Sequence, residues 1–102
     1  GRQVWREKTL LVLGRRHEEN LLLQETALPG DVLCRERDRP GPIALLRAFP
    51  RGASPGPGDL AEAARLLGLY GKGKDPLEVA DLIVFGGGEP PGGAGGGQAG
   101  GA

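Results

Sequence analysis

The sequence predicts a small α+β domain, with a mostly antiparallel sheet of four to five strands, one main helix and one or two short helices. Short apolar runs separated by Gly, Pro and Asp recur along the chain, as is typical of strands joined by turns. An Ala- and Leu-rich segment that begins near Asp59 has the apolar spacing of a helix. The chain of 102 residues is long enough for one domain at most.

Two strands are expected at the start of the chain, at Val4-Trp5 and at residues 9–13. Residues 10–13 form an unbroken apolar run, which is typical of a strand covered on both faces. Gly14 ends this run. Residues 17–24 then suit a short helix, because acidic side chains in a first turn complement the helix dipole.

The middle of the chain begins with a turn at Pro29-Gly30-Asp31. Two strand candidates follow at residues 31–35 and 43–49, joined by a connection rich in turn residues. Residues 50–58 contain three prolines and three glycines and are expected to form a flexible loop.

The main helix is the clearest element. Asp59 is the expected N-cap, with Glu62 as its capping-box partner, and the helix should end near Gly68 or Gly71. Its apolar face comprises Leu60, Ala63, Ala64 and Leu67. After it, Asp75 is expected to cap one more helical turn, and residues 80–85 read as a final apolar strand.

The foldable domain is predicted to span residues 1–85, and residues 86–102 form a separate tail. This tail holds Gly, Pro, Ala, Glu and Gln, so it lacks apolar side chains that could offset its ordering entropy and is expected to be disordered. The first residue is Gly and not Met, so a longer protein with upstream domains remains an alternative. It has no run of about 18 apolar residues, so no membrane partner is expected. The single cysteine, Cys34, excludes an internal disulfide and favours a reducing, cytoplasmic location.

Catalysis and cofactor binding have little support in the residues. One His and one Cys cannot supply the ligands that zinc needs, and the only serine lies in the loop at residues 50–58. The Gly-rich pieces lack the spacing of a phosphate-binding loop. We therefore expect no metal, no cofactor and no enzyme activity.

Arginine is the residue type that does point to a partner. Formal net charge is zero, but residues 1–51 carry ten Lys or Arg and seven Asp or Glu, a net of +3, and residues 52–102 carry three and six, a net of −3. Candidate phosphate contacts are the pair at the strand-to-helix junction, three alternating residues at a strand end and two lysines in a Gly-rich loop: Arg15, Arg16, Arg35, Arg37, Arg39, Lys72 and Lys74. Arg35, Arg37 and Arg39 should form a stripe on one face if the strand continues through them. An ordinary solvated surface is the alternative, and the intervening Glu36 and Asp38 favour it.

Several short motifs follow one another in an order that resembles the NFACT RNA-binding domain, the C-terminal module of ribosome-quality-control factors. The matching pieces, in chain order, are Gly14-Arg15, Glu19-Asn20, Asp31-Val32, Pro40-Gly41, the Leu60-Ala61-Glu62-Ala63-Ala64 helix and Tyr70-Gly71-Lys72. The chain departs from the family's W-F-H and P-G-S-H motifs, because Leu33, Arg35 and Pro42-Ile43 stand at their Trp and His positions.

The resemblance implies a non-catalytic module that binds tRNA or large-subunit ribosomal RNA in a larger protein, and it adds Asn20 to the candidate contacts. The lost Trp and His positions keep an alternative open: a degenerate copy of the fold that serves as a protein-interaction or structural domain. That alternative predicts a homodimer or partner contact through an apolar patch or an exposed edge strand such as residues 80–85.

Overall fold

The computed structural model describes residues 2–50, 52–71 and 73–86. In chain order the elements are β1 (Arg2–Arg6), β2 (Thr9–Gly14), α1 (His17–Thr26), β3 (Val32–Glu36), β4 (Ile43–Ala48), α2 (Pro57–Tyr70), the 3-10 helix η1 (Val79–Asp81) and β5 (Leu82–Gly86). These elements confirm the predicted α+β class. The predicted tail begins one residue too early, because β5 includes Gly86, and the rest of that tail lies outside the described residues.

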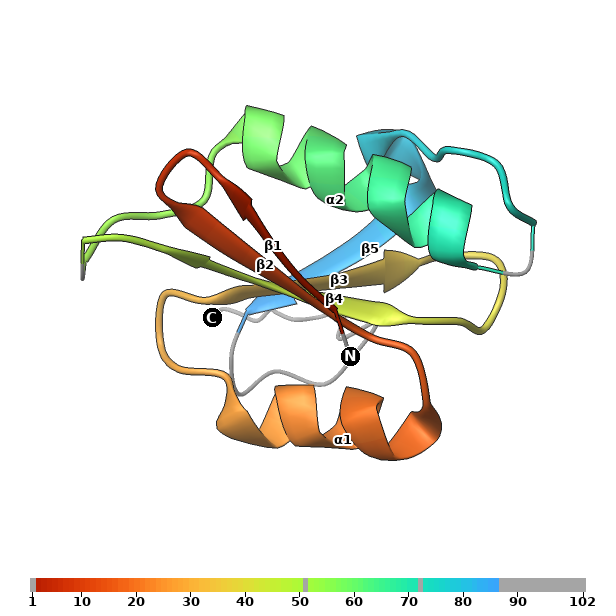
Figure 1. Cartoon of the computed structure of the whole chain (residues 1–102), viewed down its shortest axis with the longest axis horizontal. Helices are drawn as coiled ribbons and strands as arrows, with labels where there is room; N and C mark the ends of the chain where they lie inside the picture. The colour runs from red at the N-terminus through yellow and green to blue at the C-terminus, as the bar shows by residue number, and fades with distance from the viewer. Residues whose placement is uncertain (1, 51, 72, 87–102) are drawn as a thin grey trace, which may run out of the picture.

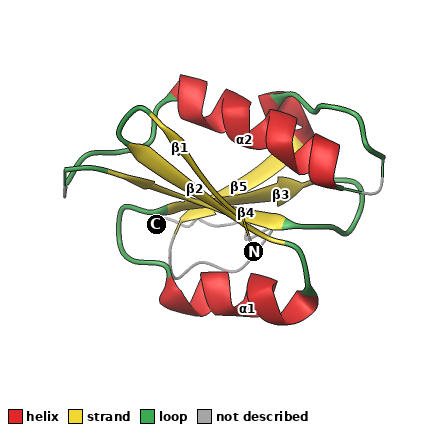
Figure 2. Ribbon diagram, in the orientation of Figure 1, coloured by secondary structure: helices red, strands yellow, loops and turns green. Residues whose placement is uncertain are grey.

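One sheet of five antiparallel strands, in the order β1-β2-β4-β3-β5, separates the two helices. Figure 1 and Figure 2 show α2 on one face and α1 on the other. Strand β2 is covered on both faces, as its apolar run predicts: Leu11 and Leu13 lie in the core under α2, and Val12 packs against the core on the α1 side.

The core under α2 is the larger of the two. Its buried members are Leu11, Leu13, Cys34, Ala44, Leu46, Ala63, Ala64, Leu66, Leu67 and Leu82. The smaller core under α1 comprises Leu33, Ile43, Leu45 and Phe85. Burial raises the pKa of the Cys34 thiol to about 12, so this cysteine is an inert packing residue at neutral pH.

Helix α2 begins three residues earlier than predicted, because its N-cap is Gly56 and not Asp59. Pro57 takes the first helical position, where a fixed φ and a missing N–H cost nothing. Asp59 therefore lies in the first turn, and its carboxylate accepts a hydrogen bond of 2.9 Å from the Gly56 N–H. The predicted pairing with Glu62 is wrong, since Glu62 instead forms a 2.6 Å ion pair with Arg65.

The end of α2 is shaped by two glycines. Gly71 is the C-cap, and it is one of the two predicted ends of this helix. Gly68 lies inside the helix and is buried, because the chain that follows α2 runs directly against it: a Cβ at this position would lie 2.7 Å from the Leu77 backbone nitrogen and closer still to the Asp75 carbonyl. The turn predicted after Asp75 occurs later, as η1, where Asp81 accepts from the Glu78 N–H at 2.9 Å.

Candidate nucleic-acid interface

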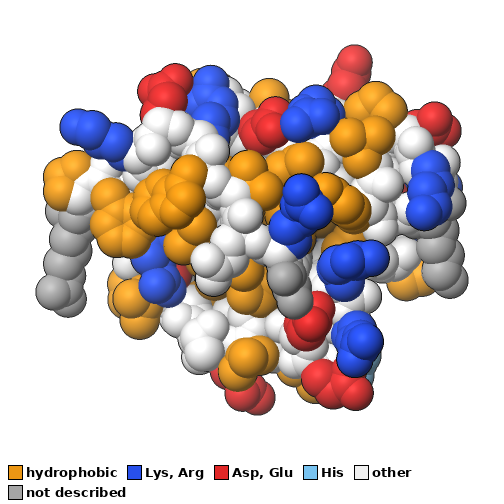
Figure 3. Space-filling view, viewed as in Figure 1, with side chains coloured by type: hydrophobic (Ala, Val, Ile, Leu, Met, Phe, Trp, Pro, Cys, Tyr) orange, Lys and Arg blue, Asp and Glu red, His pale blue; other side chains and the backbone are white. Residues whose placement is uncertain are grey.

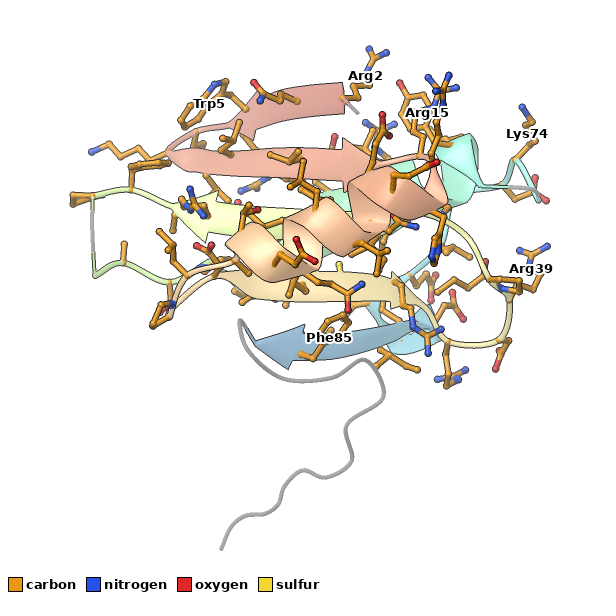
Figure 4. All side chains as sticks on the ribbon, turned by 90° about the horizontal axis from the view of Figure 1, so that it is seen from below. Arg2, Trp5, Arg15, Arg39, Lys74 and Phe85 are labelled. Carbon is orange, nitrogen blue, oxygen red and sulfur yellow. The ribbon has the colours of Figure 1, made fainter. Side chains whose placement is uncertain are left out.

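Most of the predicted cationic residues meet at one end of the sheet. This is where β2 and β3 end, where β1, β4 and β5 begin, and where α1 starts and α2 stops. We call this region the basic end, and it comprises Arg2, Arg15, Arg16, Arg35, Arg37, Arg39 and Lys74. Figure 4 labels four of these residues at or near this end. Lys72, also predicted, lies outside the described residues.

Tyr70, the last residue of α2, brings two of the arginines together. The guanidinium carbon of Arg2 lies 5.2 Å from the centre of the Tyr70 ring, and that of Arg15 lies 6.0 Å from it. Both distances fall within the range of a cation–π contact. The ring thus holds one guanidinium from β1 and one from the β2–α1 junction beside each other without an acidic residue between them.

The start of α1 is already capped from within the chain. Glu19 Oε1 accepts hydrogen bonds from the backbone N–H groups of Arg15 at 2.7 Å and Arg16 at 3.3 Å. Arg16 is the N-cap, so its N–H is one of the donors that a helix start would otherwise offer to an anion, and Arg15 directly precedes it. An anion at this end would therefore meet the exposed side chains of Arg15 and Arg16 rather than these two backbone groups.

Asn20 joins α1 to the start of β4. Its Oδ1 accepts from the Ile43 N–H at 3.1 Å, and its Nδ2 donates to the Gly41 carbonyl at 3.3 Å. A Cβ at residue 14 would lie 2.6 Å from this Oδ1, so the glycine makes room for the amide. The side chain of Asn20 is thus bound within the fold, and its predicted contact with nucleic acid stays a prediction.

The alternating arginines do not form a single row, because β3 ends at Glu36. Arg35 remains on the strand, on the α1 face, and donates to the Glu36 carbonyl at 3.0 Å. Arg37 turns toward η1 and donates to the Ala80 carbonyl at 2.7 Å, beside a 3.2 Å ion pair with Asp38. The contact between Arg37 and Ala80 holds the β3–β4 connection next to η1, at the start of β5.

Arg39 turns in another direction. It forms a 2.9 Å ion pair with Glu36, and its guanidinium lies against Gly73, where a Cβ would be 2.6 Å from Nη2. The β3–β4 connection and the loop after α2 are therefore neighbours, and Arg39 and Lys74 project at the same end of the molecule (Figure 4).

Ion pairing divides the basic end into two groups. Arg37 and Arg39 each have an acidic partner within 3.2 Å. Within residues 2–50, 52–71 and 73–86, the other cations of this end form no ion pair: Arg2, Arg15, Arg16, Arg35 and Lys74. We call these five the unpaired cations. They come from four separate segments, so the fold, and not a run in the sequence, gathers them.

The opposite end of the sheet, which we call the hairpin end, holds the β1–β2 turn, the start of α2 and the junction of α1 with β3 (Figure 1). Here arginines are bound to buried carboxylates. Arg6 donates to Asp59 at 2.9 Å, and Thr9 donates to the same carboxylate at 2.8 Å. Arg47 binds Asp31 through Nε at 3.0 Å and Nη2 at 2.7 Å. Burial raises the pKa of Asp59, but the hydrogen bonds from Gly56, Thr9 and Arg6 outweigh it and hold that pKa below its usual value.

An open hollow of about 670 Å³ lies beside the Arg47–Asp31 pair. Its other lining residues are Leu28, Pro29, Gly30, Ala48, Phe49, Gly52, Ala53 and Ser54. Among the described residues that line the hollow, Asp31 and Arg47 are the charged ones, and they bind each other. In Figure 3 hydrophobic side chains gather toward the left, the hairpin end, and several Lys and Arg side chains lie over the right half of this face.

Two further kinds of site, a metal cluster and a membrane-spanning helix, were sought in the described part of the chain. No group of three or more His, Cys, Asp or Glu residues in that part could hold a metal ion. Among the helices of the described residues, none combines the length and the apolarity that crossing a bilayer requires.

No family model, curated protein or solved structure matches this chain. Residue roles therefore come from the geometry alone. Sequence reasoning missed Arg2 and the organising role of Tyr70. Tyr70 could have been found, since it is the first residue of the Tyr70-Gly71-Lys72 motif, whereas Arg2 stands in no motif.

Proposed function

We propose that this chain is a cytoplasmic, non-enzymatic RNA-binding module that holds the phosphate backbone of tRNA or large-subunit ribosomal RNA at its basic end. The observation that carries the proposal is the set of five unpaired cations gathered from four segments. A cation without an acidic partner can release counterions from a phosphate chain, and this release is the main source of sequence-independent affinity. The resemblance to the NFACT RNA-binding domain supports the same partner.

Binding of bulk tRNA, followed by fluorescence anisotropy at about 50 and 200 mM salt, tests the proposal. If the five unpaired cations each meet one phosphate, affinity should fall roughly 100- to 500-fold between these conditions. Affinity that is absent at both salt concentrations, or equal at both, would contradict the proposal.

A matched pair of double variants assigns the binding to the unpaired cations. Arg15→Gln/Arg35→Gln and Arg37→Gln/Arg39→Gln change the net charge equally, but the second pair removes arginines that already have acidic partners. We expect the first variant to reduce the slope of log K against log salt by about two and the second to reduce it by clearly less. Circular dichroism of both variants checks that the fold is kept.

A protein-interaction role is the second candidate, and the position of β5 favours it. This strand lies at an edge of the sheet, and Val84 is 46% exposed there. An uncovered edge strand can pair with another chain. Sedimentation analysis of the chain and of Val84→Lys decides this: a dimer that the substitution removes would support the second candidate, and a monomer at all concentrations would exclude self-pairing.

A further inference from the structure

Two of the four aromatic residues of the chain lie exposed and in contact at the hairpin end. Trp5 is 59% exposed and Phe49 is 42% exposed, and their ring centres are 5.6 Å apart at an angle of 44°. The other two aromatics belong to the cores: Phe85 is buried and Tyr70 packs against the core under α2. The exposed pair belongs to neither core.

Trp5 is exposed because α1 does not reach β1. Val4 turns toward α2 and packs on its core, so its neighbour Trp5 projects from the other face of this edge strand. On that face α1 packs against β2 and β4. The Trp5 ring is thus held from one side by Phe49 and is open to a partner on the other.

The unpaired cations begin a short way along the same strand. Arg2 precedes Trp5 by three residues, about 10 Å along an extended strand, and like Val4 it projects toward α2. A nucleic-acid strand that meets both Arg2 and Trp5 must therefore cross the outer edge of β1. Arg2 shares the Tyr70 ring with Arg15. In Figure 4, Arg15, Arg2 and Trp5 follow one another along the β1 side of the molecule. A flexible nucleic-acid strand on this side would meet two guanidinium groups and then an aromatic face.

Resting on the proposed function, we propose that the bound RNA is single-stranded along β1, with phosphates on Arg2 and Arg15 and one base stacked on Trp5. Stacking on an aromatic side chain requires an unpaired base, because a duplex hides its base faces, and it tolerates any base because each has a π-face. Trp5 then adds selection of single strands to the backbone affinity of the basic end.

The only tryptophan of the chain reports on this contact directly. Intrinsic fluorescence of the whole chain is followed during titration with a single-stranded oligouridylate, with a duplex of equal length and with the same ribose-phosphate chain lacking bases. Quenching is expected with the single strand and not with the base-free chain. Anisotropy of labelled oligonucleotides measures binding independently.

Three variants separate stacking from other effects. Trp5→Ala should weaken single-strand binding about five-fold or more while leaving the salt slope unchanged, and Trp5→Phe should retain most of the affinity. Leu22→Ala is the matched control, because Leu22 is 57% exposed on α1 and should leave binding unchanged. Since Trp5 lies on the surface of an edge strand, thermal unfolding of each variant verifies folding before binding is compared.

The failures of the two proposals are distinguishable. Salt-sensitive RNA binding without quenching, together with unchanged affinity in Trp5→Ala, overturns the stacking site and leaves the proposed function standing. No binding of any RNA overturns both. Trp5 fluorescence that changes with protein concentration alone, with a dimer that Trp5→Ala abolishes, assigns the ring to a protein contact and also overturns the stacking site.

Discussion

The hairpin end and the basic end carry arginines in opposite settings. At the hairpin end, Arg6 and Arg47 bind Asp59 and Asp31, whose side chains are 10% and 5% exposed. At the basic end, five cations form no ion pair with any residue that the structure describes. Arginine is paired with a carboxylate of the fold in the first setting and has no such partner in the second, so counting charges along the sequence does not locate the proposed interface.

This contrast predicts that changes to the ion-paired residues of the hairpin end act on stability and that changes to the unpaired cations of the basic end act on affinity. The largest effect is expected for Asp31→Ala. The change removes the acceptor of Arg47 and of the Leu28 N–H, which is 2.8 Å from the carboxylate, and should lower the free energy of unfolding by about 2–3 kcal/mol. Urea denaturation measures the loss. The RNA affinity of the variant, measured without denaturant where the chain is folded, should not change. A fall in affinity without a loss of stability would break the comparison.

Asp59→Asn should give the next largest effect, and its size should depend on pH. The pKa of Asp59 is lowered by folding, so the carboxylate stabilises the fold above its unfolded pKa and loses this effect as pH falls through the folded value. The variant should be about 1–2 kcal/mol less stable than the parent at pH 7, and the difference should shrink as pH falls below 3.8, the ordinary pKa of this carboxyl group. Thermal unfolding across this pH range measures it, and a difference that is constant with pH would exclude the ionised carboxylate as the cause.

Asn20→Ala tests whether a residue at the basic end can be purely structural. Loss of the two hydrogen bonds to Gly41 and Ile43 should cost about 1 kcal/mol of stability. RNA affinity of the folded variant should stay as in the parent, because both hydrogen bonds of the side chain lie within the fold. A clear fall in affinity at unchanged salt slope would return Asn20 to the binding surface.

Tyr70→Leu should produce the smallest effect, a loss of roughly two- to five-fold in RNA affinity, because Arg2 and Arg15 lose the ring that holds them. Tyr70→Phe keeps the ring and is the matched control. Anisotropy at about 50 mM salt has the sensitivity to compare them. Equal RNA affinities of the Leu and Phe variants would show that Arg2 and Arg15 bind RNA without the aromatic ring at residue 70.

The fold was largely predictable because its signals are local. The apolar run at residues 10–13 and the spacing of the α2 face depend on neighbours within a few positions, and both elements occur as predicted. The start of α2 was not predictable in the same way. The Asp59 carboxylate accepts a hydrogen bond from the Gly56 N–H. It also accepts hydrogen bonds from Thr9 and Arg6, which are 50 and 53 positions away along the chain.

The candidate site was predictable only as a list of cations. A family motif contains Arg15, whereas Arg35 was predicted together with Arg37 and Arg39 as one alternating set. The sequence does not separate Arg35 from the other two, whose acidic partners depend on where β3 ends. Arg2 joins the site only through its contact with Tyr70. Tyr70 is far from Arg2 along the sequence and next to it in space. A contact between residues far apart in the sequence, such as Arg2 and Tyr70, is a property of the tertiary structure, which a pattern of residue types does not encode.

Gly68 limits which sequences this fold can accept. Any side chain there would push the segment at residues 73–77 away from α2, and this segment leads through η1 into β5. Strand β5 supplies Phe85 to the core under α1, on the opposite face of the sheet from α2. A single added methyl group on one face would therefore open the core on the other, and a change that usually strengthens a helix would here remove a strand.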